Sequence, residues 1–285
     1  SVHHASEVIG MDEHPGQALR KKKDASVVVA TSLVRDNRCD AVIAPGSTGA
    51  AVAAALFGLG RIKGIDRPVI ATPMPTVSGI TVMLDSGANS NSKPKHLVQG
   101  ALMGSEYAKL LLGKENPTVG LLNIGEEATK GNDVVLATYP ILEGMKTINF
   151  KGNIEGRDIP KGAVDVVVCD GFVGNVVLKF AEGLVTGLTQ LVKDSIMAGS
   201  IFAKIGAMLV KPALKKMAKR LDHTENGGAP LLGVNGVFMI AHGSSKAKEI
   251  KTAIEIASDL VERKIIQHIR ETMDIEGALK YDYDE

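Results

Sequence analysis

Short apolar runs that end in glycine or a small polar residue are the feature that most constrains this fold. Each run is rich in β-branched residues and is followed by a turn and a segment of helical character; the runs cover residues 40–44, 81–84, 118–124, 165–169 and 237–240. Continuous apolar runs are typical of strands buried on both faces. Strands that alternate with helices form βαβ units. The sequence therefore predicts an α/β protein with a mostly parallel sheet.

Apolar periodicity predicts two long helices, one over residues 175–192 and one from about residue 250 onward. Their apolar faces are formed by Val177, Phe180, Ala181, Leu184, Leu188 and Leu191, and by Ile250, Ile254, Ala257, Val261 and Ile265. Residues 204–221 are expected to return beside the first helix, giving a helical hairpin over 175–222. A projecting hairpin exposes an apolar face that a second copy would cover. We therefore predict a homodimer; the alternative is a hairpin folded onto its own sheet.

Composition and charge exclude several classes of protein. Lys and Arg number 33 against 32 Asp and Glu, a formal net charge of +1, whereas nucleic-acid binders concentrate positive charge. The chain shows no signal-peptide pattern and no uninterrupted apolar run of about 18 residues that would span a bilayer. The cysteines, Cys39 and Cys169, have neither a disulfide framework nor zinc spacing, and Cys169 falls in a predicted buried strand. These features favour one α/β domain over residues 1–285 in a reducing cytoplasm.

The loop after the first predicted strand suits an anion. Ligands of open parallel sheets bind beyond the carboxyl ends of the strands, where helix N-termini offer unpaired N–H groups. This strand end reads Gly46, Ser47, Thr48 and Gly49, directly before an Ala-rich helix. Glycine allows close backbone approach, and the helix dipole favours negative charge. The pattern indicates an oxyanion cradle or, alternatively, a simple helix N-cap.

Three further polar side chains follow predicted strands. Lys130 lies in a glycine-flanked loop, as an anion ligand or as a solvated lysine. Asn175 follows two glycines at a helix start, as a ligand or as a cap. His242 fits an acid–base role or a structural one equally well. The sequence has no nucleophile elbow and no metal-ligand spacing. It therefore predicts a site that binds anions and orients reactants, with no metal and no covalent intermediate.

A series of ordered motifs resembles one bacterial family over essentially the whole chain. The chain is similar to the phosphate acyltransferases of phospholipid synthesis, the PlsX family; the motifs cover residues 60–68, 75–79, 84–89, 93–99, 119–125, 170–175 and 241–245. The resemblance implies a three-layer α/β/α fold like that of phosphotransacetylase and isopropylmalate dehydrogenase. It also implies a homodimer without a cofactor that converts acyl-acyl-carrier-protein and inorganic phosphate into an acyl-phosphate.

The resemblance also implies site residues. Lys130 and Asn175 match the catalytic positions of the family. The residues assigned to phosphate and substrate binding are Gly46, Ser47, Thr48, Gly49, Asp85, Asn89, Gly174, His242 and Ser244. Ser47 stands where the family usually has asparagine, so a hydroxyl replaces an amide there, although a hydroxyl can still donate to phosphate.

Alternative functions remain open at the level of the sequence. A phosphotransacetylase that uses coenzyme A is the nearest, and an oxidoreductase is disfavoured because no dinucleotide fingerprint is present. The family normally has a further strand and an Asp-Ala-Met-Gly-Gly-Asp loop ahead of Ser1. If the protein truly lacks that segment, we would expect a catalytically inactive module that binds a membrane or a partner.

The tip of the predicted hairpin suits a membrane surface. Residues 196–210 are mostly apolar yet too short to span a bilayer, and a basic cluster follows, formed by Lys211, Lys215, Lys216, Lys219 and Arg220. The expected membrane contacts are Ile201, Phe202, Ile205, Met208 and Leu209. The alternatives are a buried loop with a solvated charged face and a docking site for the acidic carrier protein. The resemblance favours peripheral membrane association, with the product passed to a membrane glycerol-3-phosphate acyltransferase.

Overall fold

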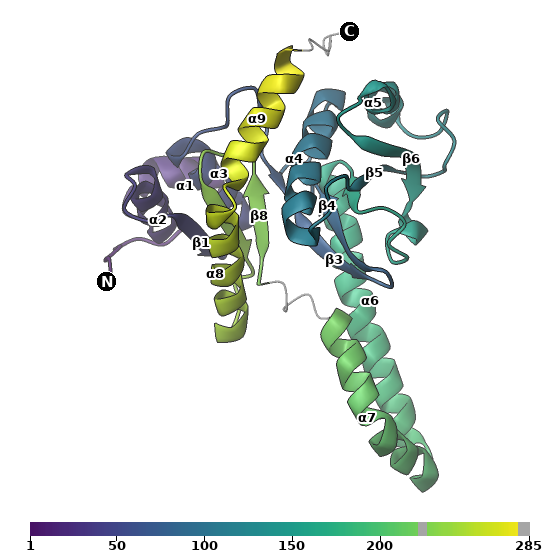
Figure 1. The fold of residues 1–285 in the computed structure, drawn as a ribbon. Coiled ribbons are helices and arrows are strands. Elements are labelled where there is room, and N and C mark those ends of the chain that lie inside the picture. The colour runs from purple at the N-terminus through teal and green to yellow at the C-terminus, as the bar shows by residue number, and fades with distance from the viewer. Residues whose placement is uncertain (222–226, 279–285) are drawn as a thin grey trace.

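Two β-sheets with helices around them form the body of the protein, and a long helical hairpin projects from it (Figure 1). The structure, a computed structural model, describes residues 1–221 and 227–278. One sheet has the order β1-β9-β8-β2, formed by Ala41–Pro45, Val237–Ala241, Ala229–Leu232 and Val69–Ile70. The other has the order β3-β4-β7-β5-β6, formed by Thr72–Thr76, Gly79–Leu84, Val166–Val168, Thr118–Asn123 and Asn149–Glu155. The predicted α/β class is confirmed.

The two sheets differ in strand direction. In the five-stranded sheet β4, β7, β5 and β6 pair in parallel, and only the edge strand β3 is antiparallel. In the four-stranded sheet only β1 and β9 are parallel, because β8 runs antiparallel to both β9 and β2. The prediction of a mostly parallel sheet is thus right for the five-stranded sheet and wrong for the four-stranded one. The cause is the short link from β8 to β9, since antiparallel strands need only a tight turn whereas parallel strands need a long crossover.

A shared hydrophobic core joins the two sheets. Helix α4 (Pro94–Leu112) is buried along most of its length and contacts β4, β7, α5 and α9. The core around it combines Val82 and Val166 of the five-stranded sheet with Val237 and Met239 of the four-stranded one. The remaining helices of the body are α1 (Pro15–Lys21), α2 (Ser26–Arg35), α3 (Thr48–Gly58), α5 (Asp133–Gly144), α8 (Ala247–Glu262), α9 (Ile265–Ala278) and the short η1 (Gly156–Asp158).

The C-terminal helical segment is broken into two helices. The apolar spacing predicted one stripe from Ile250 to Ile265, but α8 ends at Glu262 and Ile265 begins α9. Lys264 lies between them with φ +54°, a left-handed conformation that does not continue an α-helix. Ile254, predicted on the buried stripe, is largely exposed, whereas Ala257 and Ile265 are buried. After the break α9 packs against α4, where the core takes up Ile265 and Ile269.

The predicted helical hairpin is present and projects from the body (Figure 1). Helix α6 (Gly171–Ala198) and helix α7 (Ile201–Leu221) contact each other along the hairpin, and residue 222 of the predicted range lies outside the described residues. Among the hairpin residues whose burial is described, only Gly171 and Gly174, at its base, are buried. By length and composition α6 could cross a membrane, although it carries Lys179 and Glu182 in its first half.

Candidate functional site

A cavity of about 550 Å³ lies where the two sheets meet. Its polar end is formed by the loops after β1, β4 and β9 together with the start of α6; the residues there are Gly46, Thr48, Ser86, Gly87, Asn175, His242 and Ser244. The volume falls within the range of about 300–1,000 Å³ typical of small-molecule sites. The cavity therefore combines loops that are far apart in the sequence.

The N-terminus of α3 opens on this cavity. Ser47 is the N-cap, and its hydroxyl accepts a hydrogen bond from the Ala50 N–H at 3.4 Å. Ser47 is thus the helix N-cap, as the alternative interpretation predicted. It is not among the residues that line the cavity, although its hydroxyl can still donate a hydrogen bond. Gly46, with φ +145°, and Thr48 line the cavity, whereas Gly49 faces away: a Cβ there would lie 2.7 Å from Pro15.

The turn after β9 lies beside the turn after β1. The Gly46 N–H donates to the Ala241 carbonyl at 3.3 Å, and Gly243 sits close to Gly46. Within this turn the Ser244 N–H donates to His242 Nδ1 at 3.2 Å, and the Ser244 hydroxyl lies 2.7 Å from the same nitrogen. Because a backbone N–H can only donate, Nδ1 is an acceptor and the neutral ring carries its proton on Nε2. His242 therefore has a donor left for a ligand.

Asp85 holds the turn after β4 together. Its Oδ1 accepts from the N–H groups of Ile70, Gly87 and Ala88 at 2.9–3.1 Å, and its Oδ2 accepts from the backbone and side-chain N–H groups of Asn89, both at 2.8 Å. Burial raises the pKa of this carboxyl, and the hydrogen bonds from Ala88, Ile70, Asn89 and Gly87 oppose that rise. Asp85 as a whole is only 3% exposed, and neither Asp85 nor Asn89 lines the cavity. Both residues shape the turn that borders the cavity, and their direct contact with substrate stays a prediction.

Two glycines bring the start of α6 against this turn. A Cβ on Gly171 would lie 2.2 Å from the Asn89 carbonyl oxygen, and one on Gly174 would lie 1.9 Å from that of Asp85. Gly174 thus serves close packing, not the predicted ligand contact. The consequence is that the Asn175 side chain lies against Gly87 inside the cavity, with its Cγ 3.3 Å from where a Gly87 Cβ would be. Asp170 caps the helix, so Asn175 is not the cap.

Lys130 lies outside the cavity. It is exposed, in the loop that follows β5, and its side chain passes over Gly125. The loop is held by Asn123, whose Nδ2 donates to the Lys130 carbonyl at 2.9 Å. Because β5 pairs with β7, this loop emerges beside the β7 end that leads to Asn175. The structure thus places Lys130 at the same end of the five-stranded sheet as Asn175 but outside the cavity.

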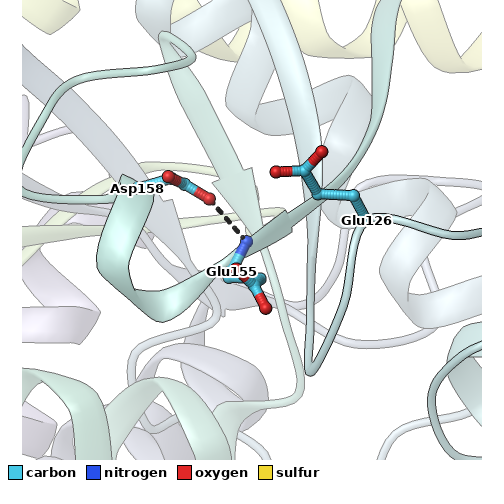
Figure 2. Close-up of side chains that lie close together, drawn as sticks. All are labelled: Glu126, Glu155 and Asp158. Atoms are coloured by element: carbon cyan, nitrogen blue, oxygen red, sulfur yellow. Dashed lines mark hydrogen bonds between the residues drawn. The ribbon is translucent and has the colours of Figure 1, made fainter.

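Folding also gathers three carboxylates that no sequence spacing relates. Figure 2 shows Glu126, Glu155 and Asp158, whose oxygens lie within 4.8 Å of one another. Glu155 pairs with Arg157, and Asp158 pairs with Lys161 at 2.8 Å. The hydrogen bonds from Lys161 and from the Glu155 N–H keep the pKa of Asp158 below its usual range. Two of the three carboxylates are therefore already neutralised by cationic partners.

Cys169 is buried at the end of β7. Its Sγ lies 3.6 Å from the Asp85 carbonyl oxygen, and burial raises the pKa of the thiol well above its usual range. A neutral buried thiol is a poor nucleophile. Its packing role agrees with the sequence prediction.

Known proteins place this chain in a family. A family profile described as fatty acid synthesis protein matches residues 1–268. A phosphate acyltransferase from Desulfitobacterium hafniense (strain DSM 10664 / DCB-2) is 56% identical over 273 residues, covering 95% of this chain and 81% of the relative. One from Heliobacterium modesticaldum is 58% identical over 267 residues, covering 94% and 79%. The chain belongs to the phosphate acyltransferase family. The resemblance predicted from the ordered motifs is confirmed, and the chain is an acyltransferase of that family.

Solved structures of phosphotransacetylases share this fold. EutD phosphotransacetylase from Staphylococcus aureus matches with a TM-score of 0.57 at 14% identity, covering 88% of this chain and 71% of that one. A phosphotransacetylase from Streptococcus pyogenes matches with a TM-score of 0.54 at 17% identity, covering 90% and 70%. At such identities the likeness concerns the fold alone. It confirms the predicted three-layer α/β/α architecture.

Several cavity residues were missed by the sequence prediction. Ser86 and Gly87 fall inside the motif that drew attention to Asp85, yet they line the cavity and Asp85 does not. Thr72 was not considered at all, although its hydroxyl lies 2.5 Å from that of Ser86. For Ser86 and Gly87 the sequence did contain a signal, because small residues follow a predicted strand beside an aspartate.

Proposed function

We propose that this chain transfers a fatty acyl group from an acyl-carrier-protein thioester to inorganic phosphate in the cavity between the sheets. Membership of the family supports acyl transfer to phosphate. The observation that carries the location is the polar end of the cavity, where the α3 N-terminus, the His242–Ser244 turn and Asn175 converge. Such N–H and hydroxyl donors suit a phosphate. No nucleophilic side chain is required there.

The reaction needs positioning more than activation. A phosphate ester has its second pKa at about 6. Inorganic phosphate is likewise substantially ionised at neutral pH, so one of its oxygens can attack the thioester carbonyl carbon directly. The C–S bond of the tetrahedral intermediate then breaks, releasing a thiolate whose thiol has a reference pKa of about 8.5. The products are an acyl-phosphate and the free carrier thiol. The protein has to align the reactants and stabilise the oxyanion.

Asn175 is proposed to orient phosphate or donate to the carbonyl oxygen. Lys130, which lies outside the cavity in the loop after β5, is proposed to hold phosphate as a point charge from that side. Asn175→Ala is expected to lower kcat by about 100-fold, the effect of losing one oxyanion donor. Lys130→Ala is expected to raise the KM for phosphate, and Lys146→Ala, an exposed lysine after α5, is its matched control. Unchanged phosphate kinetics in Lys130→Ala would remove the role of Lys130 and leave the reaction standing.

Release of carrier protein tests the reaction itself. Palmitoyl-carrier-protein incubated with phosphate and the protein is expected to yield free carrier protein, dependent on phosphate. The same assay with palmitoyl-coenzyme A tests the second candidate, a phosphotransacetylase that uses coenzyme A; two phosphotransacetylases share the fold of this chain. Transfer from coenzyme A alone would replace the proposed donor. No release from either thioester would overturn the proposed function.

We also propose that the hairpin forms a homodimer interface. A row of large apolar side chains on α6 is left exposed by the described part of the chain; it includes Phe172, Val176, Phe180, Leu188 and Leu191. Burying such a row against its copy removes an exposed patch that a monomer rarely carries. Sedimentation at about micromolar concentration is expected to show a dimer, and Phe180→Glu a monomer. A monomeric wild type would exclude this interface.

The hairpin tip is proposed to contact the cytoplasmic membrane surface and to bring the enzyme near a membrane glycerol-3-phosphate acyltransferase. Support comes from the exposure of the predicted contacts Ile201, Phe202, Ile205, Met208 and Leu209, all open to solvent, ahead of Lys211, Lys215 and Lys216. Apolar residues beside lysines suit anionic headgroups.

Flotation with anionic vesicles tests this contact. Ile201→Glu and Leu209→Glu are expected to abolish flotation while transfer in solution continues, and added salt is expected to weaken it. Phe57→Glu, an exposed aromatic residue on α3, is the matched control. Flotation that ignores both tip substitutions would mean that the tip is not the membrane contact.

A further inference from the structure

The cavity continues from its polar end into an apolar half. Its lining there combines Leu178, Ala181 and Val185 of α6 with Met74 of β3 and Ile159. Met74 and Ile159 are 9% and 3% exposed and belong to one buried cluster, against which Leu178 and Ala181 pack. The apolar half is therefore a wall continuous with the hydrophobic core.

The α6 part and the β3 part of this wall both begin at the polar end. On α6 the lining residues extend from Asn175 to Val185, a distance of about 15 Å at the rise of an α-helix. On β3 they extend from Thr72, which contacts Ser86, to Pro75, about 10 Å at the rise of a strand. An elongated molecule with its head at Asn175 would thus lie along the wall that α6 and β3 form.

The charged residues in the lining have partners. Lys179 and Glu182 form an ion pair at 2.8 Å, and Glu249 accepts from the Lys246 N–H. Among the described residues that line the cavity there is no Phe, Tyr or Trp. Such a lining lacks the aromatic faces on which a nucleobase stacks. It suits a flexible hydrocarbon chain.

We propose that this apolar half binds the fatty acyl chain of the substrate and that Ala181 and Val185 set the length that is accepted. The inference rests on the proposed function, which supplies the acyl group, and adds where the chain lies. The thioester carbon would sit beside Asn175, and the hydrocarbon would run along α6 past Ala181 to Val185. Val185 is one helical turn farther from Asn175 than Ala181. A bulky residue at Ala181 would therefore exclude shorter chains than one at Val185.

Chain-length selectivity tests the proposal. Ala181→Phe is expected to lower the ratio of kcat/KM on palmitoyl-carrier-protein to that on octanoyl-carrier-protein by about tenfold or more, in the range of lost pocket contacts. Val185→Phe is expected to lower the ratio less, and Ala198→Phe, at the exposed end of the same helix, is expected to leave it unchanged. Ratios that do not change in either lining variant would overturn the assignment, as would an equal change in the control.

Direct binding separates this inference from the proposed reaction. Calorimetry with palmitate requires no turnover, so it reports on the apolar half even if no acyl transfer occurs. Wild type is expected to bind palmitate, and Ala181→Phe to weaken binding by about tenfold or more. Should Ala181→Phe fail to give a cooperative melting curve, Val185→Phe, on a half-buried position, takes its place. Palmitate binding that is absent, or that is equal in wild type and the folded lining variant, would overturn the proposal.

Discussion

The five-stranded sheet and the α6–α7 hairpin are both rich in apolar residues but differ in how many of them are buried. Val82, Leu84, Val119, Leu121 and Val166 of the sheet are entirely buried within one chain. On the hairpin, large apolar side chains from Phe172 to Met217 remain exposed, and among its residues with described burial only two glycines at the base are buried. The sheet owes its stability to its own core, whereas the apolar surface of the hairpin is open to solvent within this chain. The same kind of substitution should therefore change the free energy of unfolding differently in the two regions.

Truncating a leucine in each region should give the largest contrast. Leu121→Ala in β5 is expected to destabilise the protein by about 2–5 kcal/mol, because it leaves a cavity in a closely packed core. Leu209→Ala at the hairpin tip, where the side chain is 78% exposed, is expected to change stability by less than about 0.5 kcal/mol. Urea unfolding followed by circular dichroism measures both. Equal losses would mean that the tip packs within the chain.

Glycine-to-alanine substitutions along α6 should change sign between its base and its exposed part. Gly174→Ala is expected to cost about 1–3 kcal/mol or more, because its Cβ would lie 1.9 Å from the Asp85 carbonyl oxygen. Gly187→Ala, with nothing within 4 Å of the new Cβ, is expected to stabilise by about 0.5–1 kcal/mol through helix propensity. Thermal melting of both variants measures the sign of each change in stability. A stabilising Gly174→Ala would contradict the packing described at the base.

The sequence predicted well the elements whose signal is local. The strands β1, β5 and β9 match the predicted runs to within one or two residues, because continuous β-branched residues have few other stable arrangements. The hairpin was predictable for a similar reason, namely the long 3.6-residue period on α6. The edge strand β3 was not, because Pro73 and Pro75 argue against a strand and are tolerated only where one side lacks a neighbour.

The candidate site was less predictable because it depends on contacts between distant segments. Asp85 was assigned to the substrate on its motif, but its partners include Ile70, across the junction of the two sheets. Likewise, Gly174 was assigned a ligand role, although its lack of a side chain lets α6 approach Asp85. The apolar half of the cavity combines β3, Ile159 and α6, and no local pattern relates these segments.

The smallest contrast concerns charge, between Asp165 at the start of β7 and Asp36 after α2. Burial alone would raise the pKa of Asp165, but the bonds from Lys114 at 2.5 Å and from the Thr118 N–H and hydroxyl at 2.9 and 2.8 Å lower it overall. A carboxyl whose pKa is lower in the folded state stabilises the protein above its unfolded pKa of about 3.9, and this contribution is lost as pH falls through the folded value. Asp165→Asn is thus expected to destabilise the protein at neutral pH by about 1 kcal/mol, after allowance for its partial exposure. The difference from wild type should shrink as the pH falls below about 4. Asp36→Asn, which loses only an exposed pair with Arg35, is expected to leave the urea midpoint unchanged. Urea midpoints across this pH range measure both, and a loss in Asp165→Asn that stays constant with pH would show that its ionised form is not the stabilising one.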